Sequence, residues 1–284
     1  MPDIVIHVVA SALYAGLALH FWLTRWRVQP ERWRTTPAGD GAAPGALGLR
    51  AWERAAILVP LALNCALLYA DLFDARELRF GFAQALSTML CLSIAICWIE
   101  GLLYNIEKLY SMALAVAALC VPLPAFFSGR LAPDAFPLEF RLHLIAGMLA
   151  YSLFAVAMLH AVLISIVERQ LHSNPGRVDR GLPPLLSMEA LVFRLTGAAF
   201  AVLTLTFVVG AMYSESIFGR AMRFDHKTVF VVLSWIIFGW LLFGRWRYGW
   251  RGRTAFRWTL AGFLMLMLAY PGSRFVFEVI LGRH

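Results

Sequence analysis

Charged residues are scarce in this sequence. Lys, Arg, Asp and Glu make up 15% of its 284 residues, whereas hydrophobic residues make up 61%. Soluble domains are typically about 25% charged and about 45–50% apolar. This shortage of charge excludes an ordinary soluble globular domain and predicts an integral membrane protein that has the lipid bilayer as its surroundings.

Cysteines are few, and none belongs to a metal or haem attachment motif. No CxxC or CxxCH occurs, and four cysteines fall within apolar segments: Cys65, Cys91, Cys97 and Cys120. We therefore interpret them as small buried hydrophobic residues. The motifs of nucleophile-elbow hydrolases, zinc proteases and nucleotide-binding enzymes are also missing. We expect no enzymatic activity.

Positive charge is present, but it is gathered in alternate loops. The formal net charge is +8, and loops 24–54, 99–108, 167–194 and 245–257 hold 16 of the 25 Lys and Arg. The other set of loops, which includes both termini, holds 9. This is the positive-inside pattern of membrane proteins, so we expect no nucleic-acid partner. The bias places the richer loops in the cytoplasm and both termini on the extracytoplasmic side.

Long apolar segments separate these loops. A membrane-spanning helix needs about 20 mostly apolar residues. Eight segments meet this condition: 4–23, 55–73, 80–99, 107–127, 141–166, 191–213, 227–244 and 256–280. The sequence predicts an all-α polytopic integral membrane protein with about eight transmembrane helices, forming a single membrane domain over residues 1–284. We expect Pro271-Gly272 to kink or end the last helix, because proline lacks a backbone donor.

One short charged segment stands between two long apolar segments. It reads Met222-Arg223-Phe224-Asp225-His226-Lys227-Thr228 and lies on the predicted extracytoplasmic side. It brings an acid, an imidazole and an ammonium to a membrane surface. Phe224, Tyr213, Phe218 and Trp235 are close enough in sequence to wall a flat apolar ligand there, although rings near membrane interfaces also form belts that bind nothing.

Histidines fall at two depths of the predicted bundle. His143 and His226 begin their helices on the outer side, whereas His20 and His160 lie toward the cytoplasmic ends. At about 1.5 Å per residue, the rise from His143 to His160 is about 25 Å. Neutral imidazole is the usual axial ligand of haem iron. Each pair is a candidate ligand pair, and hydrogen-bonded packing residues are the alternative for each.

Arg274 and Glu278 lie one helical turn apart in the last apolar segment. We expect this spacing to form an ion pair on the helix surface. Arg274 is also placed to meet an anionic group of a ligand.

Several short segments of the second half of the chain form a recognisable set. They are Leu142-His143-Leu144, Ala150-Tyr151-Ser152, Met188-Glu189-Ala190-Leu191, Phe193-Arg194-Leu195, Thr204-Leu205-Thr206 with Gly210, Asp225-His226-Lys227-Thr228-Val229, and Gly244-Arg245-Trp246-Arg247-Tyr248-Gly249-Trp250-Arg251-Gly252-Arg253. With them, residues 56–281 resemble the cytochrome c assembly family of membrane haem-handling proteins. The match is to its shorter branch, which has eight spans and no large periplasmic domain.

In the haem-delivering members of that family, a tryptophan-rich outer loop ends in Trp-Asp-Pro-Lys-Glu and lies under the haem. Histidines of neighbouring outer loops ligate the iron. Here the equivalent segment reads Phe224-Asp225-His226-Lys227-Thr228, so the Asp and Lys persist, the tryptophans are missing and His226 replaces the proline. The first outer histidine of the family maps onto His143, and the second has no clear counterpart.

The resemblance implies a haem-binding protein of the bacterial inner membrane that assists cytochrome c biogenesis. Non-covalent haem b would be ligated by His143 and His226, with Phe224 against the porphyrin. Asp225, Lys227 and Arg274 complete the expected haem-binding set, the two cations pairing with propionates. Other cytochrome c assembly proteins would be its partners.

Two alternative functions stand beside this one. The first is a haem-free accessory or regulatory subunit, in tetrapyrrole regulation or beside a divalent-cation efflux protein, acting through its cytoplasmic arginines and the 167–190 loop. The second is a small transporter. It is the least favoured, because acids are scarce in the spans and other polar residues, such as Asn64, Gln84 and Thr204, are scattered.

Overall fold

The computed structural model describes residues 2–26, 49–70, 79–127, 129–131, 138–173, 185–218 and 225–281. In chain order the helices are α1 (Pro2–Phe21) with the π-helical turn η1 (Trp22–Trp26), α2 (Ala51–Tyr69), α3 (Phe82–Leu103), α4 (Glu107–Cys120), α5 (Leu123–Phe126), α6 (Leu138–Ser173), α7 (Leu185–Phe218), α8 (His226–Tyr248) and α9 (Gly252–Met267). The last part comprises η4 (Leu268–Gly272), α10 (Ser273–Phe275) and η5 (Val276–Ile280). A two-residue antiparallel pairing joins β1 (Arg79–Phe80) to β2 (Arg130–Leu131).

The prediction of eight apolar spans is confirmed. Within the part of the chain that the structure describes, eight helices are long and apolar enough to cross a membrane. Helices satisfy their own backbone hydrogen bonds, which a span in hydrocarbon requires. Two helices are much longer than predicted: α6 has 36 residues and α7 has 34. Apolarity marks only the part of a helix that crosses the hydrocarbon, and both helices continue beyond it.

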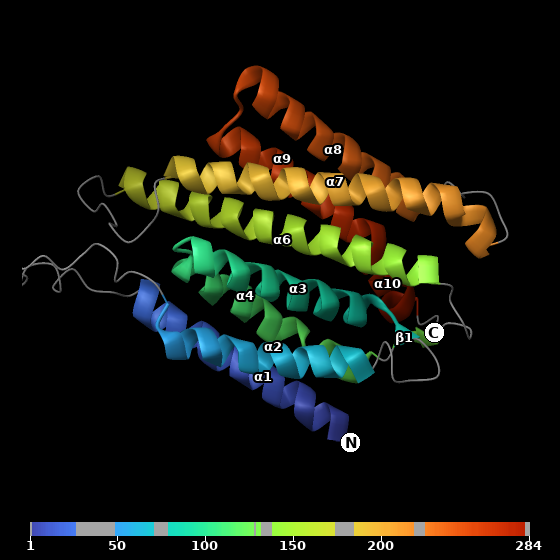
Figure 1. Ribbon diagram of the computed structural model, residues 1–284, viewed down its shortest axis with the longest axis horizontal. Coiled ribbons are helices and arrows are strands. Elements are labelled where there is room, and N and C mark those ends of the chain that lie inside the picture. The colour runs from blue at the N-terminus through green and yellow to red at the C-terminus, as the bar shows by residue number, and fades with distance from the viewer. Residues whose placement is uncertain are drawn as a thin grey trace, which may run out of the picture.

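The helices form one bundle in which α3 and α6 lie side by side in the middle (Figure 1). Helices α1, α2 and α4 cover one side of this pair, and α7, α8 and α9 cover the other. The two chain ends lie at the same end of the bundle, together with the start of α6, the end of α7 and the start of α8. We call this the terminal end. An even number of spans produces this arrangement.

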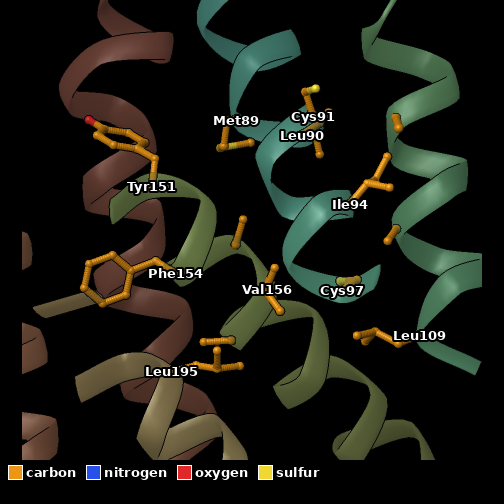
Figure 2. Close-up of a cluster of buried hydrophobic side chains, with 14 of the residues drawn as sticks. Met89, Leu90, Cys91, Ile94, Cys97, Leu109, Tyr151, Phe154, Val156 and Leu195 are labelled. Atoms are coloured by element: carbon orange, nitrogen blue, oxygen red, sulfur yellow. The ribbon is translucent and has the colours of Figure 1, made fainter. Parts of the chain in front are cut away.

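The core lies between α3 and α6, and α6 is the most buried of the eight spans (Figure 2). From α6, Phe154 stacks on Phe238 of α8, with ring centroids 3.8 Å apart and planes 16° apart. Cys91 and Cys97 of α3 are buried in this core, which confirms their interpretation as small apolar residues. The same interpretation is wrong for Cys65, whose side chain lies exposed on α2.

The last span does not end at Pro271. The chain instead passes through η4, a π-helical turn that contains Pro271, and continues as α10 and η5 to Ile280. A proline cannot donate to the preceding turn, and a local π-helical turn absorbs that missing hydrogen bond. The span is therefore irregular but complete, and its last turns reach the terminal end.

A close contact of α9 with α8 is made at a glycine. A Cβ atom on Gly262 would lie 2.8 Å from the ring of Phe238, which is fully buried and cannot turn away because it stacks on Phe154. Small residues at such contacts let membrane helices approach closely. Gly262 therefore sets the distance between the two helices.

We expect Gly262→Ala to lower the apparent unfolding temperature of the protein in detergent, because overpacking a core costs about 1–3 kcal/mol. The matched control is Gly197→Ala on α7, where an added Cβ meets nothing within 4 Å. This control should keep or raise the unfolding temperature, because alanine favours the helix by about 1 kcal/mol. Equal effects of the two substitutions would contradict the tight contact.

Candidate functional site

The terminal end of the bundle holds three of the residues predicted to bind a ligand. His143 lies in the first turns of α6, His226 is the first residue of α8, and Arg274 belongs to α10. These elements come together at the same end of the bundle (Figure 1). The predicted placement of the outer histidines at one membrane surface therefore agrees with the fold.

His143 is fixed by the contact between α6 and α7. Its imidazole packs on Gly210, where an added Cβ would lie 2.7 Å from the ring carbon Cε1. One turn deeper, a Cβ atom added to Gly147 of α6 would lie 3.8 Å from the methyl group of Thr206. The Thr206 main chain lies near the ring, but no hydrogen bond of good geometry reaches the buried His143 Nδ1. The ring is thus held in place with one nitrogen unsatisfied.

His226 is held by the cap of α8. Asp225 is the N-cap residue, and its carboxylate accepts hydrogen bonds from the Thr228 backbone N–H at 3.0 Å and from the Thr228 hydroxyl at 3.1 Å. Partial burial acts to raise the pKa of the Asp225 carboxyl. The hydrogen bonds from Thr228 and the nearby Lys227 and His226 outweigh it and lower that pKa below its ordinary value. The sequence suggested a ligand contact for Asp225, and the structure shows its capping role.

The His226 ring is exposed and lies against Phe277 of η5, with centroids 5.7 Å apart. This contact joins the start of α8 to the last turns of the chain. Among the described residues, no hydrogen bond or ion pair is formed by the His226 ring itself.

Arg274 forms the ion pair that its spacing predicted. Its Nη1 lies 3.8 Å from Glu278 Oε1, and its guanidinium lies over the ring of Tyr270. The other carboxylate oxygen of Glu278 accepts a hydrogen bond from the backbone N–H of Phe82 at 3.3 Å. Glu278 is buried, and these two contacts stabilise the start of α3 and the Arg274 side chain. The sequence indicated the pair but not its contact with α3.

The expected aromatic wall is only partly placed by the structure. Phe224 lies outside the described residues, as do the side chains of Tyr213 and Phe218. Trp235 stacks on Phe200 of α7 and donates its indole N–H to the hydroxyl of Thr204 at 2.9 Å. It therefore joins α8 to α7 well inside the span and does not belong to the first turn of α8.

The structure does not bring the two inner histidines together. His160 of α6 lies 3.1 Å from Glu100 of α3 through Nε2 and Oε2, and both side chains are buried. The sequence placed Glu100 in a loop, but it belongs to α3. His20 instead meets Glu53 of α2 at 3.0 Å. Helices α1 and α6 lie on opposite sides of α3 and α4 (Figure 1). The two histidines are therefore apart, and each pairs with a different carboxylate.

Arg25 completes the cluster around Glu53. It binds that carboxylate at 2.9 Å and Glu107 of α4 at 3.0 Å. Glu53 also accepts from the backbone N–H of Arg50 and so caps α2. The expectation that acids are scarce in the spans missed these groups, because a glutamate at a helix end reads as a loop residue in the sequence.

Two further observations limit the candidate site. None of the contacts among the described residues joins His143 directly to His226. An open pocket lies at the opposite end of the bundle, between α6, α7 and α9, and its walls include Glu168, Glu189 and Gly252. In that pocket Glu189 accepts a hydrogen bond from the Gly252 backbone at 2.9 Å, so it caps α9.

Comparison with known proteins identifies the relatives of this chain. The family model described as "Cytochrome C assembly protein" matches residues 54–281. The chain belongs to the cytochrome c assembly protein family. The match includes every element that carries a candidate site residue, from α6 to η5. No solved structure matches the chain.

Individual relatives of this chain carry different names. Inner membrane protein YpjD of Escherichia coli K12 is 29% identical over 241 residues, which cover 81% of this chain and 89% of YpjD. "Uncharacterized 28.8 kDa protein in nifR3-like 5'region" of Azospirillum brasilense is 37% identical over 144 residues, 50% of this chain and about half (52%) of that protein. Cytochrome c biogenesis protein CcsA of Chlamydomonas reinhardtii is 23% identical over 137 residues, 48% and 38% of the two chains.

We expect Asp225→Ala to loosen the first turn of α8, because losing an N-cap side chain costs about 1 kcal/mol. Hydrogen–deuterium exchange should show about fivefold faster exchange of amides in residues 226–232, with little change in the middle of α8. The matched control is Asp225→Asn, since asparagine caps as well as aspartate.

The pH dependence gives a second check of this cap. The pKa of Asp225 is lowered in the folded protein, so its contribution is complete above the ordinary carboxyl value of about 3.9 and is lost as the pH falls through the folded value. Asp225→Asn should show no such loss. Equal exchange in the wild type and Asp225→Ala at neutral pH would contradict the capping role.

Proposed function

We propose that this protein is a haem-handling protein of the bacterial inner membrane that assists cytochrome c biogenesis. Membership of the cytochrome c assembly protein family supports the general role. The names of the CcsA relatives refer to cytochrome c biogenesis, and the name of YpjD refers to the inner membrane. The eight apolar spans fit a multi-pass membrane protein.

The observation that carries the haem proposal is the state of His143. A buried ring nitrogen without a hydrogen bond costs free energy. His160 also has one, but its other nitrogen meets Glu100, whereas no carboxylate among the described residues meets His143. The packing of the ring on Gly210 holds it in one position, as a ligand needs. His226 lies at the same end of the bundle with its ring free of hydrogen bonds among the described residues. Neutral imidazoles of this kind fit haem iron.

In this proposal His143 and His226 hold non-covalent haem b as cargo, and the haem supplies the iron that they ligate. His143 is the fixed ligand, because two long helices position it. His226 is the adjustable ligand, because it is exposed and is the first residue of α8, directly after the N-cap residue Asp225. A fixed and an adjustable ligand suit a carrier that takes up and releases its cargo, without catalytic turnover.

The remaining predicted site residues take supporting roles in the proposal. Phe224 precedes the cap of α8 and would pack on the porphyrin. Lys227 would pair with a propionate. Arg274 already binds Glu278 through one nitrogen, and its guanidinium has further N–H groups for a second anion. The Lys and Arg bias of the loops places this end of the bundle, with both termini, on the extracytoplasmic side.

A haem-free accessory or regulatory subunit is the second candidate function. Two observations favour it: the segment before α8 lacks the family's tryptophans, and none of the described contacts joins the two histidines. An absorption spectrum of the detergent-purified protein with a pyridine haemochrome assay decides between the two. A Soret band with near-stoichiometric haem supports the carrier. A colourless protein that takes up no added haem supports the accessory subunit, with an efflux or other membrane protein as its partner.

We expect His143→Ala and His226→Ala each to weaken haem binding at least about tenfold, since loss of groups that only support a metal ligand already costs about 10–100-fold. Haem titration of the purified variants measures this. The control is His172→Ala, because His172 is exposed at the other end of the bundle and bonds only to its own helix at the Glu168 carbonyl. Full haem binding in both site variants would refute the assignment.

We also expect Gly210→Ala to weaken haem binding and shift the Soret band, because the added methyl group would displace the His143 ring. Gly197→Ala is the matched control on the same helix, with open space around the added Cβ. Both variants should show the same helix content by circular dichroism. An unchanged spectrum and affinity in Gly210→Ala would show that haem does not depend on the position of His143.

A further inference from the structure

Two cysteines from neighbouring spans lie in contact. Cys65 of α2 and Cys91 of α3 have their sulfur atoms 3.3 Å apart. The backbones of these helices pack against each other along the α1–α2–α3 side of the bundle. In the described part of the chain, Cys97 and Cys120 have no sulfur neighbour of this kind. This pair was not predicted, because its members are 26 residues apart in the sequence and outside any motif.

The surroundings of the two thiols are polar, which is unusual inside a span. Tyr14, Asn64 and Ser87 come from α1, α2 and α3, and each is at most 1% exposed. Ser87 donates a hydrogen bond to the Asn64 side-chain carbonyl at 3.1 Å. The Tyr14 hydroxyl lies near Asn64 and the two thiols. Among the described residues, neither this hydroxyl nor the Asn64 side-chain nitrogen makes a hydrogen bond of good geometry. Polar groups at such a depth are costly and mark functional sites.

The pair is open on one side only. Cys91 is buried, at 4% exposure, whereas Cys65 lies exposed on the outer surface of α2. Since α2 is one of the eight apolar spans, the outer surface at Cys65 faces lipid. A molecule dissolved in the bilayer can therefore reach Cys65 from the lipid side.

We propose that Cys65 and Cys91 form a reversible disulfide whose electron acceptor is a lipid-dissolved quinone. Both S–H bonds break and one S–S bond forms. The two electrons and two protons released reduce the quinone to its hydroquinone, so the reaction balances. The unsatisfied amide of Asn64 and hydroxyl of Tyr14 are polar groups that can hydrogen-bond the thiolate that attacks or the quinone oxygen.

The small separation of the sulfur atoms makes the closure local. A disulfide holds the Cβ atoms of its two cysteines about 3.5–4.5 Å apart. The sulfur atoms of Cys65 and Cys91 are already in contact at 3.3 Å, so rotation of the two side chains is the movement that closure requires. The product would join α2 covalently to α3. This inference does not use haem, so it stands or falls separately from the proposed function.

The test uses the full-length protein in nanodiscs of phosphatidylethanolamine and phosphatidylglycerol. The reduced protein is incubated with decylubiquinone and then denatured and alkylated with a maleimide, and its intact mass gives the number of reactive thiols. We expect the wild type to fall from four reactive thiols to two, with formation of one hydroquinone per protein. Cys65→Ser and Cys91→Ser should each keep their three thiols. Cys120→Ser, the matched control, should fall from three to one.

Each other outcome overturns the proposal. Four remaining thiols in the wild type, after both decylubiquinone and copper–phenanthroline, would show that the pair does not close. Closure by copper–phenanthroline alone would show that a quinone is not the acceptor. Loss of two thiols in Cys65→Ser would show that Cys91 pairs elsewhere. The main result is the loss of two reactive thiols in the wild-type protein. It does not depend on the folding of any variant.

Discussion

Polar groups inside a membrane must find their partners within the chain, and this requirement shapes the whole bundle. The backbone meets it by forming helices. The buried carboxylates meet it through pairs between helices: Glu53 binds His20 and Arg25, Glu100 binds His160, and Glu278 binds Arg274 and the start of α3. These pairs join α1 to α2, α3 to α6, and the last turns of the chain to α3. They hold the bundle together at both of its ends.

His143 differs from the other histidines of the bundle in this respect. His20 and His160 each meet a carboxylate through Nε2, whereas no carboxylate among the described residues meets the His143 ring, which is fixed against Gly210. The buried Nδ1 atoms of His143 and His160 both lack a hydrogen bond. A structural histidine is expected to use the partners that its surroundings offer. A rigidly held ring with an unsatisfied nitrogen suits a ligand, which is why the proposed function depends on this residue more than on any other.

The fold was largely predictable, and the site only in part. Eight spans follow from apolarity over about 20 residues, which is a local property, and the Arg274–Glu278 pair follows from a spacing of one helical turn. Glu100 was misplaced because α3 runs beyond its apolar stretch. The inner histidines were paired by depth alone, but depth does not say which helices are neighbours. Phe224 remains a prediction from resemblance to the family.

The sequence by itself determined that the chain is a membrane protein of eight spans, that it belongs to the cytochrome c assembly family, and that His143 and His226 lie at the same end of the bundle. Only the tertiary structure decided which side chains meet: His143 with Gly210, His160 with Glu100, and Cys65 with Cys91. The physical reason is that helical periodicity fixes which residues share a face. The neighbour and rotation of each helix depend instead on small-residue contacts and polar pairs between residues far apart in the chain.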